Sequence, residues 1–346
     1  MKYGVIFGAK SFEHEISIVS AVVLKGLLPS AVFVFCDANR EFYLIPNEKL
    51  RANFFTKWEY KKCVKLSLEN GGFYAKKLLG KEKIEADVFI NLIHGADGED
   101  GKMAGLLEFF GIKFIGPRLE ASVLSYSKYL TKLLASSVGV KSLEYEVIYK
   151  GQKPTMSFPI ILKPLHLGSS IGVSVVKEQS ELEYALDVAF EFDDAVLVEP
   201  FISGVKEYNL AGAMVNNEIV YSIIEEPSKK EFLDYEQKYI SFSAESNVRE
   251  AELSDEIVNK FKDAFTRVYK SGFKGAIIRC DFFLVENEVY LNEINPNPGS
   301  LANYLFKDFL GLLDGVANSL PNEMDINIDY KFINTITHAK GSPKLS

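Results

Sequence analysis

The sequence predicts an α/β protein in three parts: an N-terminal doubly wound parallel sheet, a small central α+β domain and a C-terminal α+β domain. Residues 1–117 alternate apolar strand patterns with amphipathic helical patterns, whereas short strand patterns dominate after residue 140. With 346 residues, the chain is long enough for several domains, each with its own core. We therefore expect domains at residues 1–120, 121–203 and 204–346.

The N-terminal elements follow from hydrophobic periodicity. Three short apolar runs are typical of buried parallel strands: residues 3–7, 31–36 and 88–93. Between the first two runs, residues 16–28 carry apolar side chains at helical spacing, which predicts a doubly wound arrangement. The pattern ends at the turn signal Gly116-Pro117. The loop at residues 8–11 lacks GxGxxG, so neither a dinucleotide site nor a dehydrogenase is expected.

The remaining elements are read in the same way. A helix is predicted at residues 121–137, and strands are predicted at residues 145–149, 159–163, 171–176 and 195–199. Farther on, residues 255–270 read as a helix and residues 275–300 contain a hairpin. The segment 225–247 is rich in charge and tyrosine, a composition that fits a mobile loop better than a core element, and we expect it to close as a lid.

Composition narrows the class of protein. The chain is 47% hydrophobic and 25% charged, as in soluble globular proteins. Its net charge of -8 and the absence of a basic stripe argue against a nucleic-acid partner. No leader pattern or membrane-spanning apolar run is visible, and Cys36, Cys63 and Cys280 form no CxxC pair, so we expect a reduced, cytoplasmic protein without a membrane partner.

The most informative segment is the hairpin, which carries Arg279, Asp281, Glu293 and Asn295. If its turn centres on Asn287 without a bulge, Asp281 faces Glu293, Arg279 faces Asn295, and all four side chains share one face. Facing carboxylates repel unless a cation lies between them, and two carboxylates with an amide oxygen suit Mg²⁺. For any one of these residues an ordinary solvent-facing hairpin explains the pattern better. For all four together, followed by the rigid loop at residues 295–299, a metal and phosphate site is favoured.

A second group of residues surrounds a loop of small residues. The strand at residues 159–163 delivers Lys163 to the sequence Gly168-Ser169-Ser170, whose backbone N–H groups and hydroxyls can approach an anion. A strand follows this loop, which excludes a Walker P-loop, and the loop alone is more often a simple hairpin turn. Downstream, Glu199 lies in an apolar run. If it is buried it needs a partner, for which an adenine amino group is one candidate, and the alternative is an exposed strand end.

Taken together, these motifs resemble the ATP-grasp enzymes and, within them, the D-alanine:D-alanine ligase family. The resemblance rests on several motifs that occur in order over nearly the whole chain: residues 7–17 (FGAKSFEHEIS), 94–101 (HGADGEDG), 163–172, 234–239 (DYEQKY), 279–281 and 295–299. It implies a three-domain ATP-grasp fold. It also implies ATP as co-substrate, two Mg²⁺ ions with Mn²⁺ as a possible substitute, D-alanine as substrate, and a homodimer.

The resemblance also implies roles for individual residues. ATP would be bound by Lys128, Lys163, Ser170, Glu199, Phe201, Ile202, Glu207 and Lys238. The metals would be held by Asp281, Glu293 and Asn295. The substrates would be bound by Glu15, His94, Arg279, Gly299, Tyr304 and Leu305. The catalytic set would be Glu15, Ser169, Tyr239, Arg279 and Gly299, with Glu15 on the ammonium of the first D-alanine and linked through Ser169 to Tyr239.

The implied reaction is the ATP-dependent joining of two D-alanines through an acyl phosphate, for peptidoglycan precursor synthesis. The alternative is a ligase that uses D-lactate as second substrate, against which Tyr239 argues. A non-catalytic protein on the same fold is disfavoured because the charged set is intact. Two residues depart from the family pattern: Tyr304 stands where many relatives carry serine, and Leu233 stands where they often carry tyrosine. The tail at residues 322–346 matches no functional pattern.

Overall fold

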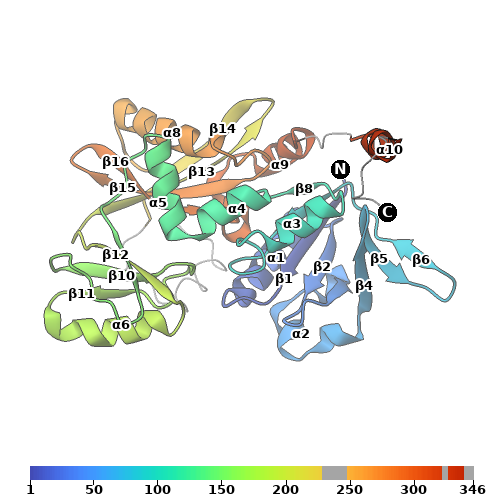
Figure 1. Ribbon diagram of the computed structural model, residues 1–346, viewed down its shortest axis with the longest axis horizontal. Coiled ribbons are helices and arrows are strands. Elements are labelled where there is room, and N and C mark those ends of the chain that lie inside the picture. Colours follow the sequence, from blue (N-terminus) through green and yellow to red (C-terminus); the bar gives the residue numbers. More distant parts are fainter. Residues whose placement is uncertain (228–247, 322–325, 339–346) are drawn as a thin grey trace.

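The computed structural model describes residues 1–227, 248–321 and 326–338. Within them the chain forms three sheets, one of eight strands and two of four, with helices packed on each (Figure 1). The expected lid at residues 225–247 lies almost wholly outside the described residues, as do Leu233, Lys238 and Tyr239.

The eight-stranded sheet has the order β6-β5-β4-β3-β2-β1-β7-β8. Its strands are β1 (Tyr3–Gly8), β2 (Val32–Cys36), β3 (Phe42–Ile45), β4 (Val64–Glu69), β5 (Gly72–Lys76), β6 (Lys81–Lys83), β7 (Val88–Asn91) and β8 (Phe114–Ile115). The strands β2, β1, β7 and β8 pair in parallel, as predicted, but β3 to β6 extend the sheet in antiparallel pairs. The predicted parallel sheet is therefore confirmed for half of a mixed sheet. Short connections such as the one between β4 and β5 permit only antiparallel neighbours.

Helices cover both faces of this sheet, which makes it doubly wound. Alternate residues of β1 point to opposite sides, so Val5 and Phe7 pack with the helix α1 (His14–Leu27) while Ile6 packs with α3 (Lys102–Phe109). Three shorter helices complete this region: α2 (Ala52–Thr56), η1 (Asn47–Lys49) and η2 (Glu59–Lys62). The loops that follow β1 and β7 contact the other two parts of the chain, because Glu13 accepts from Ser169 and Ile93 accepts from Asn297.

The central sheet is antiparallel, in the order β11-β10-β12-β9. Its strands are β9 (Glu146–Tyr149), β10 (Ile160–Pro164), β11 (Ser174–Val176) and β12 (Ala195–Pro200). One face packs against α6 (Leu182–Phe190), which follows the short η3 (Gln179–Glu181). The preceding helices α4 (Leu119–Tyr126) and α5 (Lys128–Ser137) contribute Ala121, Leu134 and Ala135 to the core of the third sheet instead.

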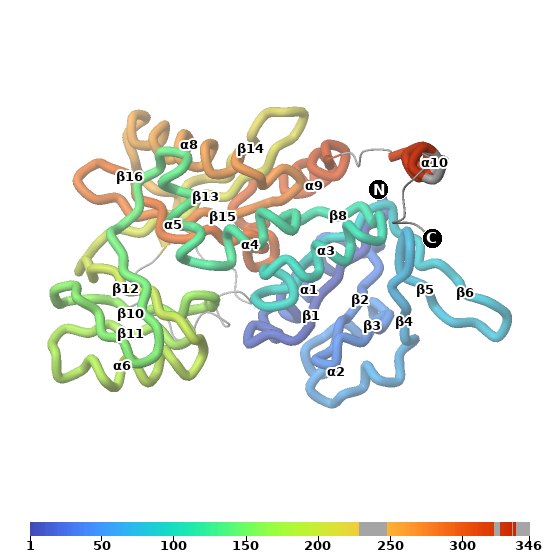
Figure 2. The backbone as a smooth tube through the Cα atoms, viewed as in Figure 1, coloured from blue at the N-terminus to red at the C-terminus, as the bar shows by residue number. Residues whose placement is uncertain are grey.

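The third sheet has the order β14-β13-β15-β16 and is antiparallel throughout. Its strands are β13 (Lys206–Val215), β14 (Glu218–Glu225), β15 (Ile278–Val285) and β16 (Glu288–Asn295). The amphipathic helix α8 (Asp255–Lys270) buries Phe261, Phe265 and Val268 against it. The chain then passes through η4 (Gly299–Leu305) to α9 (Phe309–Asn318), whose apolar side chains join the core of the N-terminal sheet. The smooth trace shows this return toward the N-terminus, before α10 (Lys331–His338) (Figure 2).

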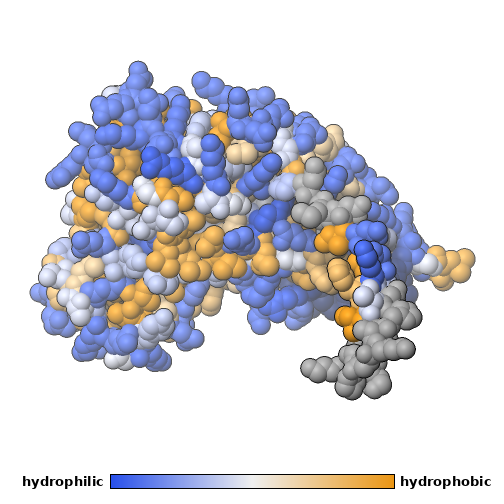
Figure 3. All heavy atoms as spheres, turned by 45° about the horizontal axis from the view of Figure 1, so that its top comes forward, coloured by the Kyte–Doolittle hydropathy of each residue, from blue (hydrophilic) through white to orange (hydrophobic). Residues whose placement is uncertain are grey.

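Some apolar side chains remain on the surface. The hairpin between β5 and β6 projects from the body of the molecule and carries Leu78 and Leu79, which are 100% and 92% exposed. An apolar tip is visible at that edge in the space-filling view (Figure 3). No helix in residues 1–227, 248–321 or 326–338 is long and apolar enough to cross a membrane.

Candidate active site

The hairpin β15–β16 has the predicted pairing, but its turn differs from the expected one and its register shifts beside Asp281. Asp281 lies opposite Glu293 and Arg279 opposite Asn295, which confirms the expected register. The expected turn was wrong, because a tight turn places Glu286 and Asn287 at φ of 50° and 62°, and the register then shifts by one residue beside Asp281. The shift restores the alignment that a turn centred on Asn287 would have given.

The polar side chains of this hairpin contact one another. Arg279 donates from Nε to Asp281 Oδ1 at 2.7 Å and from Nη2 to Asp281 Oδ2 at 2.8 Å. Asn295 Nδ2 donates to the same Oδ2 at 3.0 Å. Burial raises the pKa of Asp281 to about 6, the negative charge of Glu293 adds to this effect, and Arg279 opposes it. Two half-buried carboxylates that face each other repel, and a cation bound between them would offset that repulsion.

The donor set of the hairpin fits a hard divalent cation. Asp281 and Glu293 supply carboxylate oxygens, and Asn295 supplies an amide group. Across the described ranges of the chain, no three His, Cys, Asp or Glu side chains gather as a metal centre.

A buried group of charges lies behind the hairpin. Glu199 of β12 is 1% exposed, and its two carboxylate oxygens accept hydrogen bonds from Lys132 and from Lys163, the latter at 2.6 Å. Lys163 also donates to Asn292 Oδ1 at 3.1 Å. Of the two alternatives for Glu199, the structure has the buried one, and the partners of its carboxylate are Lys132 and Lys163. These two lysines lower the pKa of Glu199 despite its burial.

A pocket lies against β16 of the hairpin. It is lined by Glu99, Ser125, Tyr126, Lys128, Thr131, Leu167, Gly168, Asn292, Glu293, Ile294 and Asn295. Lys128 donates to the carbonyl oxygen of Leu167, and burial lowers its pKa. Glu99, which also lines the pocket, has a pKa well above its usual range because it is buried, and Glu13 adds to the shift. The pocket thus combines a lysine with the carboxylate of the hairpin.

The residue that contacts Ser169 is Glu13, not Glu15. Ser169 Oγ donates to Glu13 Oε1 at 2.5 Å, and Glu13 is 6% exposed. Glu15 lies in the first turn of α1 and is exposed, so the expected link from Glu15 to Ser169 is wrong. The helix begins at His14, which leaves Glu13 in the preceding loop, where its side chain turns inward.

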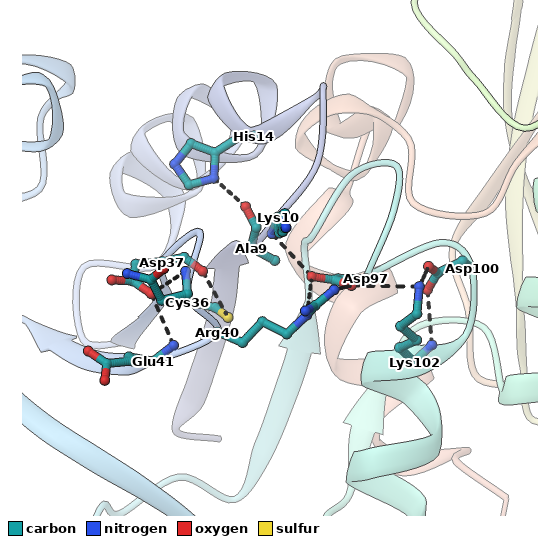
Figure 4. Close-up of polar contacts among 11 residues, drawn as sticks. Ala9, Lys10, His14, Cys36, Asp37, Arg40, Glu41, Asp97, Asp100 and Lys102 are labelled. Atoms are coloured by element: carbon teal, nitrogen blue, oxygen red, sulfur yellow. Dashed lines mark hydrogen bonds and ion pairs between the residues drawn. The ribbon is translucent and has the colours of Figure 1, made fainter. Parts of the chain in front are cut away.

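Two glycines make room for the Glu13 carboxylate. A Cβ at Gly95 would lie 2.7 Å from Glu13 Oε2, and a Cβ at Gly168 would lie 3.0 Å from Oε1. The loop that carries Glu13 is held by Asp97, which accepts from Lys10 N at 3.2 Å and from Arg40 Nε at 2.9 Å (Figure 4). The loops after β1 and β7 are thereby joined around this carboxylate.

The expected residues of the second-substrate side lie between the C-terminal and N-terminal sheets. Tyr304 accepts a hydrogen bond at its hydroxyl from Arg279 Nη1 at 3.5 Å. Leu305 is 1% exposed and packs with Ala211. His94 is 4% exposed, and its ring nitrogens lie next to the Ser20 hydroxyl and the Leu92 carbonyl oxygen.

The expected nucleotide residues on the central sheet are less enclosed. Ser170 and Glu207 are exposed, and Phe201 and Ile202 are half-buried at the end of β12. Phe201 is held by its backbone N–H, which donates to the carbonyl oxygen of Pro159 at 3.0 Å. Lys238 and Tyr239 lie outside the described residues.

Four residues of this region had no role assigned from the sequence: Glu13, Glu99, Lys132 and Asn292. Lys132 could have been found, because it lies four residues after Lys128 and therefore on the same face of a helix. Asn292 is displaced by the register shift, which no sequence pattern indicated.

Comparisons with known proteins agree over the whole chain. A family model described as D-ala D-ala ligase N-terminus matches residues 2–117, and one described as D-ala D-ala ligase C-terminus matches residues 134–309. A protein of Campylobacter concisus named D-alanine–D-alanine ligase is 65% identical over 100% of both chains. A protein of Wolinella succinogenes with the same name is 56% identical over 99% of this chain and 100% of its own. The crystal structure of D-alanine-D-alanine ligase from Helicobacter pylori is 52% identical and covers 93% of this chain and 100% of its own, with a TM-score of 0.84.

Proposed function

The chain belongs to the D-alanine:D-alanine ligase family, and from this premise we propose how its residues carry out the reaction. Enzymes of this kind join two D-alanines into D-alanyl-D-alanine with ATP, for peptidoglycan precursor synthesis. The D-lactate alternative is not supported, because relatives that are 56% to 65% identical carry the name of the dipeptide-forming enzyme. The observation that carries the residue assignments is the register of β15 and β16, which places Arg279, Asp281, Glu293 and Asn295 side by side.

Lys128 and Lys163 bind the phosphates of ATP. Both are largely enclosed, both lie beside the hairpin, and a lysine is a compact point charge suited to a phosphate. Phe201 and Ile202 line the adenine site at the end of β12, while Ser170 and Glu207 lie at its exposed rim. Glu199 acts indirectly, because its carboxylate holds Lys163 in place. Lys238, outside the described residues, completes the phosphate contacts in this proposal.

Asp281, Glu293 and Asn295 would hold Mg²⁺, or Mn²⁺ in its place. When bound, two such ions neutralise the charge that spreads over the transferred phosphoryl group. Arg279 contributes a fixed positive charge at the same position, because its bidentate contact with Asp281 fixes the guanidinium plane.

Glu13, rather than Glu15, binds the ammonium group of the first D-alanine. Its carboxylate is buried, accepts from Ser169, and lies beside Glu99 and the pocket wall. A buried carboxylate favours a cationic partner. The D-alanine carboxylate then points toward the hairpin, where its oxygen attacks the γ-phosphate of ATP to form an acyl phosphate and ADP.

The second D-alanine attacks the acyl carbon through its deprotonated amine. The tetrahedral oxyanion is stabilised by Arg279 and by the Gly299 backbone N–H, and its collapse releases phosphate. Tyr304 lies beside Arg279 and binds the carboxylate of the second D-alanine through its hydroxyl, with Leu305 supporting this loop. Tyr239, outside the described residues, would extend the contacts of Ser169, and the segment 225–247 would cover the site.

A homodimer and a cytoplasmic location are part of the proposal. The family resemblance supports the dimer, and the three cysteines, which are all unpaired, fit a reducing compartment. Light scattering of the purified protein at micromolar concentration would give twice the monomer mass. A monomer at all concentrations would remove the dimer from the proposal.

The proposal is tested by Glu293→Gln, with Glu288→Gln as matched control. Both changes remove one carboxylate charge from β16, but Glu288 pairs with Lys141 at the surface, at 2.8 Å. We expect Glu293→Gln to lower D-alanyl-D-alanine formation by at least about 10²-fold, because it removes charge at the phosphoryl-transfer site, whereas Glu288→Gln stays near normal. Equal turnover of the two variants at the same Mg²⁺ concentration would show that the metal assignment is wrong.

A further inference from the structure

Three consecutive residues adopt a left-handed backbone directly after Gly299. Ser300, Leu301 and Ala302 have φ angles of 50°, 56° and 51°. Such a run is unfavourable without glycine because each Cβ crowds the following carbonyl oxygen, and it persists only where the surroundings hold it. All three residues are at most 3% exposed. The loop that follows Gly299 therefore depends on contacts made by other elements.

One of these contacts comes from α1. The backbone N–H of Ser300 donates to Ser20 Oγ at 3.0 Å. Ser20 Oγ lies 3.3 Å from Nε2 of His94, whose Nδ1 lies 2.9 Å from the carbonyl oxygen of Leu92. Ser20 and His94 are 2% and 4% exposed. A buried chain of hydrogen bonds thus runs from the end of β7, through α1, to the loop after Gly299.

The direction of each hydrogen bond in this chain is determined. The carbonyl oxygen of Leu92 can only accept, so Nδ1 of His94 carries the proton. Burial lowers the pKa of His94 to about 4, and its ring is neutral at pH 7 with Nε2 as an acceptor. The Ser20 hydroxyl therefore donates to Nε2, which leaves its oxygen lone pairs for the Ser300 N–H. The hydroxyl of Ser20 has a single orientation in which every group is satisfied.

We infer that Ser20 is a positioning residue for the ligase reaction: held by His94, it fixes the Ser300 backbone so that the adjacent Gly299 N–H faces the developing oxyanion. The inference rests on the proposed function, which gives Gly299 that role. It also assigns His94 a role different from the substrate contact expected from the sequence, since His94 acts through Ser20.

Ser17 provides a matched control on the same helix. Its hydroxyl is fully buried, accepts from Gly8 N at 2.8 Å and donates to the carbonyl oxygen of Leu92 at 2.7 Å. Ser17→Ala and Ser20→Ala remove the same atom from neighbouring turns of α1. Ser17 shares the Leu92 carbonyl oxygen with His94 and otherwise holds Gly8 of β1, whereas Ser20 reaches the loop after Gly299.

The test compares kcat and KM for Ser20→Ala, Ser17→Ala, His94→Leu and the double variant Ser20→Ala/His94→Leu in the full chain. We expect Ser20→Ala and His94→Leu each to lower kcat by about 10- to 100-fold, with KM for ATP changed less than about twofold, because a misplaced donor acts in the transition state. The double variant should be no slower than either single variant, since both break one chain. His94→Gln should recover part of the loss, because its carbonyl oxygen can accept from Ser20.

A kcat for Ser20→Ala equal to that of Ser17→Ala would overturn the inference, and so would losses that multiply in the double variant. If Ser20→Ala does not fold, Ser20→Cys, which is similar in size but a weak acceptor, replaces it in the same comparison. Glu293→Gln is measured in parallel. Full activity of Glu293→Gln would contradict the proposed function itself, whereas an inactive Glu293→Gln with an unaffected Ser20→Ala would contradict this inference alone.

Discussion

Lys132, Glu199 and Lys163 show how single residues inside the protein maintain the phosphate site. The carboxylate of Glu199 lies between two ammonium groups at 1% exposure, so both lysines depend on it for a counter-charge. Lys132 is not among the residues that line the pocket, and its ammonium group pairs with Glu199. Lys163 is thereby held in a largely enclosed position next to the hairpin.

Replacing Glu199 with glutamine should therefore destabilise the fold strongly. The change leaves two buried lysines without a counter-charge, and breaking a buried ion pair typically costs about 3 to 5 kcal/mol. Glu288→Gln is the control, because its partners Lys141 and Lys260 are at the surface, where solvent screens ion pairs and they contribute little to stability. Urea unfolding of both variants measures the difference. Equal midpoints would show that the buried charges are not coupled.

His94 predicts a pH dependence of stability. Its pKa is lowered from 6.5 to about 4 by burial, so between these values the unfolded chain binds a proton that the folded chain does not. Above about pH 6.5 the buried neutral ring costs no stability. As the pH falls from 6.5 toward 4, the free energy of unfolding decreases. At 1.36 kcal/mol per pH unit below 6.5, the loss is about 2 kcal/mol at pH 5. The raised pKa of Asp281 has the opposite effect, because its contribution to stability decreases as the pH rises from about 4 to about 6.

The difference between wild type and His94→Leu isolates this contribution. The free energy of unfolding of wild type relative to the variant should fall between pH 7 and pH 5. A constant difference over this range would mean that His94 is not buried as a neutral ring.

Among the elements, the hairpin β15–β16 depends on one extra residue. The two-residue turn alone would place Asp281 opposite Asn292, and the register shift beside Asp281 moves Glu293 into that position. Because side chains alternate between the two faces of a strand, a slip by one residue would send Glu293 to the opposite face. The shifted position also brings Asn292 to Lys163.

Deleting Asn292 and replacing it with alanine should have similar effects. Asn292 is the extra residue of β16, so its deletion removes the bulge and leaves Glu293 directly opposite Asp281. Both variants lose the hydrogen bond to charged Lys163, which should raise KM for ATP by roughly tenfold or more with turnover changed much less. A turnover at least about 10²-fold lower for the deletion than for Asn292→Ala would show that the bulge itself is needed to place the site.

The same elements show what the sequence could predict. The pairing of Asp281 with Glu293 was predictable because alternation along two strands places like charges face to face, which requires a compensating ligand. The bulge was not predictable from the sequence, because a tight turn with a bulge and a wider turn without a bulge give the same pairing at the site. Glu13 precedes α1 and Glu15 lies in its first turn, and the space left at Gly95 and Gly168 admits the Glu13 carboxylate. That space depends on residues far away in the sequence.

At the scale of the whole molecule, the packing crosses the expected domain boundaries. α9 buries Phe309, Leu312 and Leu313 in the core of the N-terminal sheet, although it follows the C-terminal hairpin. α4 and α5 pack with the third sheet, although the sequence suggested the central domain. The loop at Gly299 lies where these parts meet, so the site is held by segments from both ends of the chain.

C-terminal truncations test which segments after the hairpin stabilise the fold. Removing residues 322–346 should change the free energy of unfolding by less than about 1 kcal/mol, because the described side chains of α10, such as Phe332 at 80% exposure, bury little area. Removing residues 309–346 also deletes α9 and should prevent stable folding. Thermal unfolding of both truncated chains measures the effect of each truncation on stability. A folded protein without α9 would contradict the packing of α9 against the N-terminal sheet.

The most direct test of the central claim, that the hairpin site transfers phosphate to the carboxylate of D-alanine, follows an oxygen atom. D-alanine labelled with ¹⁸O in both carboxylate oxygens is converted with unlabelled ATP, and the phosphate released is analysed by mass spectrometry. In the acyl phosphate one labelled oxygen bridges carbon and phosphorus, and it leaves with the phosphate when the amine attacks the carbon. We expect one ¹⁸O atom in each phosphate and one in each peptide carbonyl. Unlabelled phosphate accompanying the dipeptide would contradict the account.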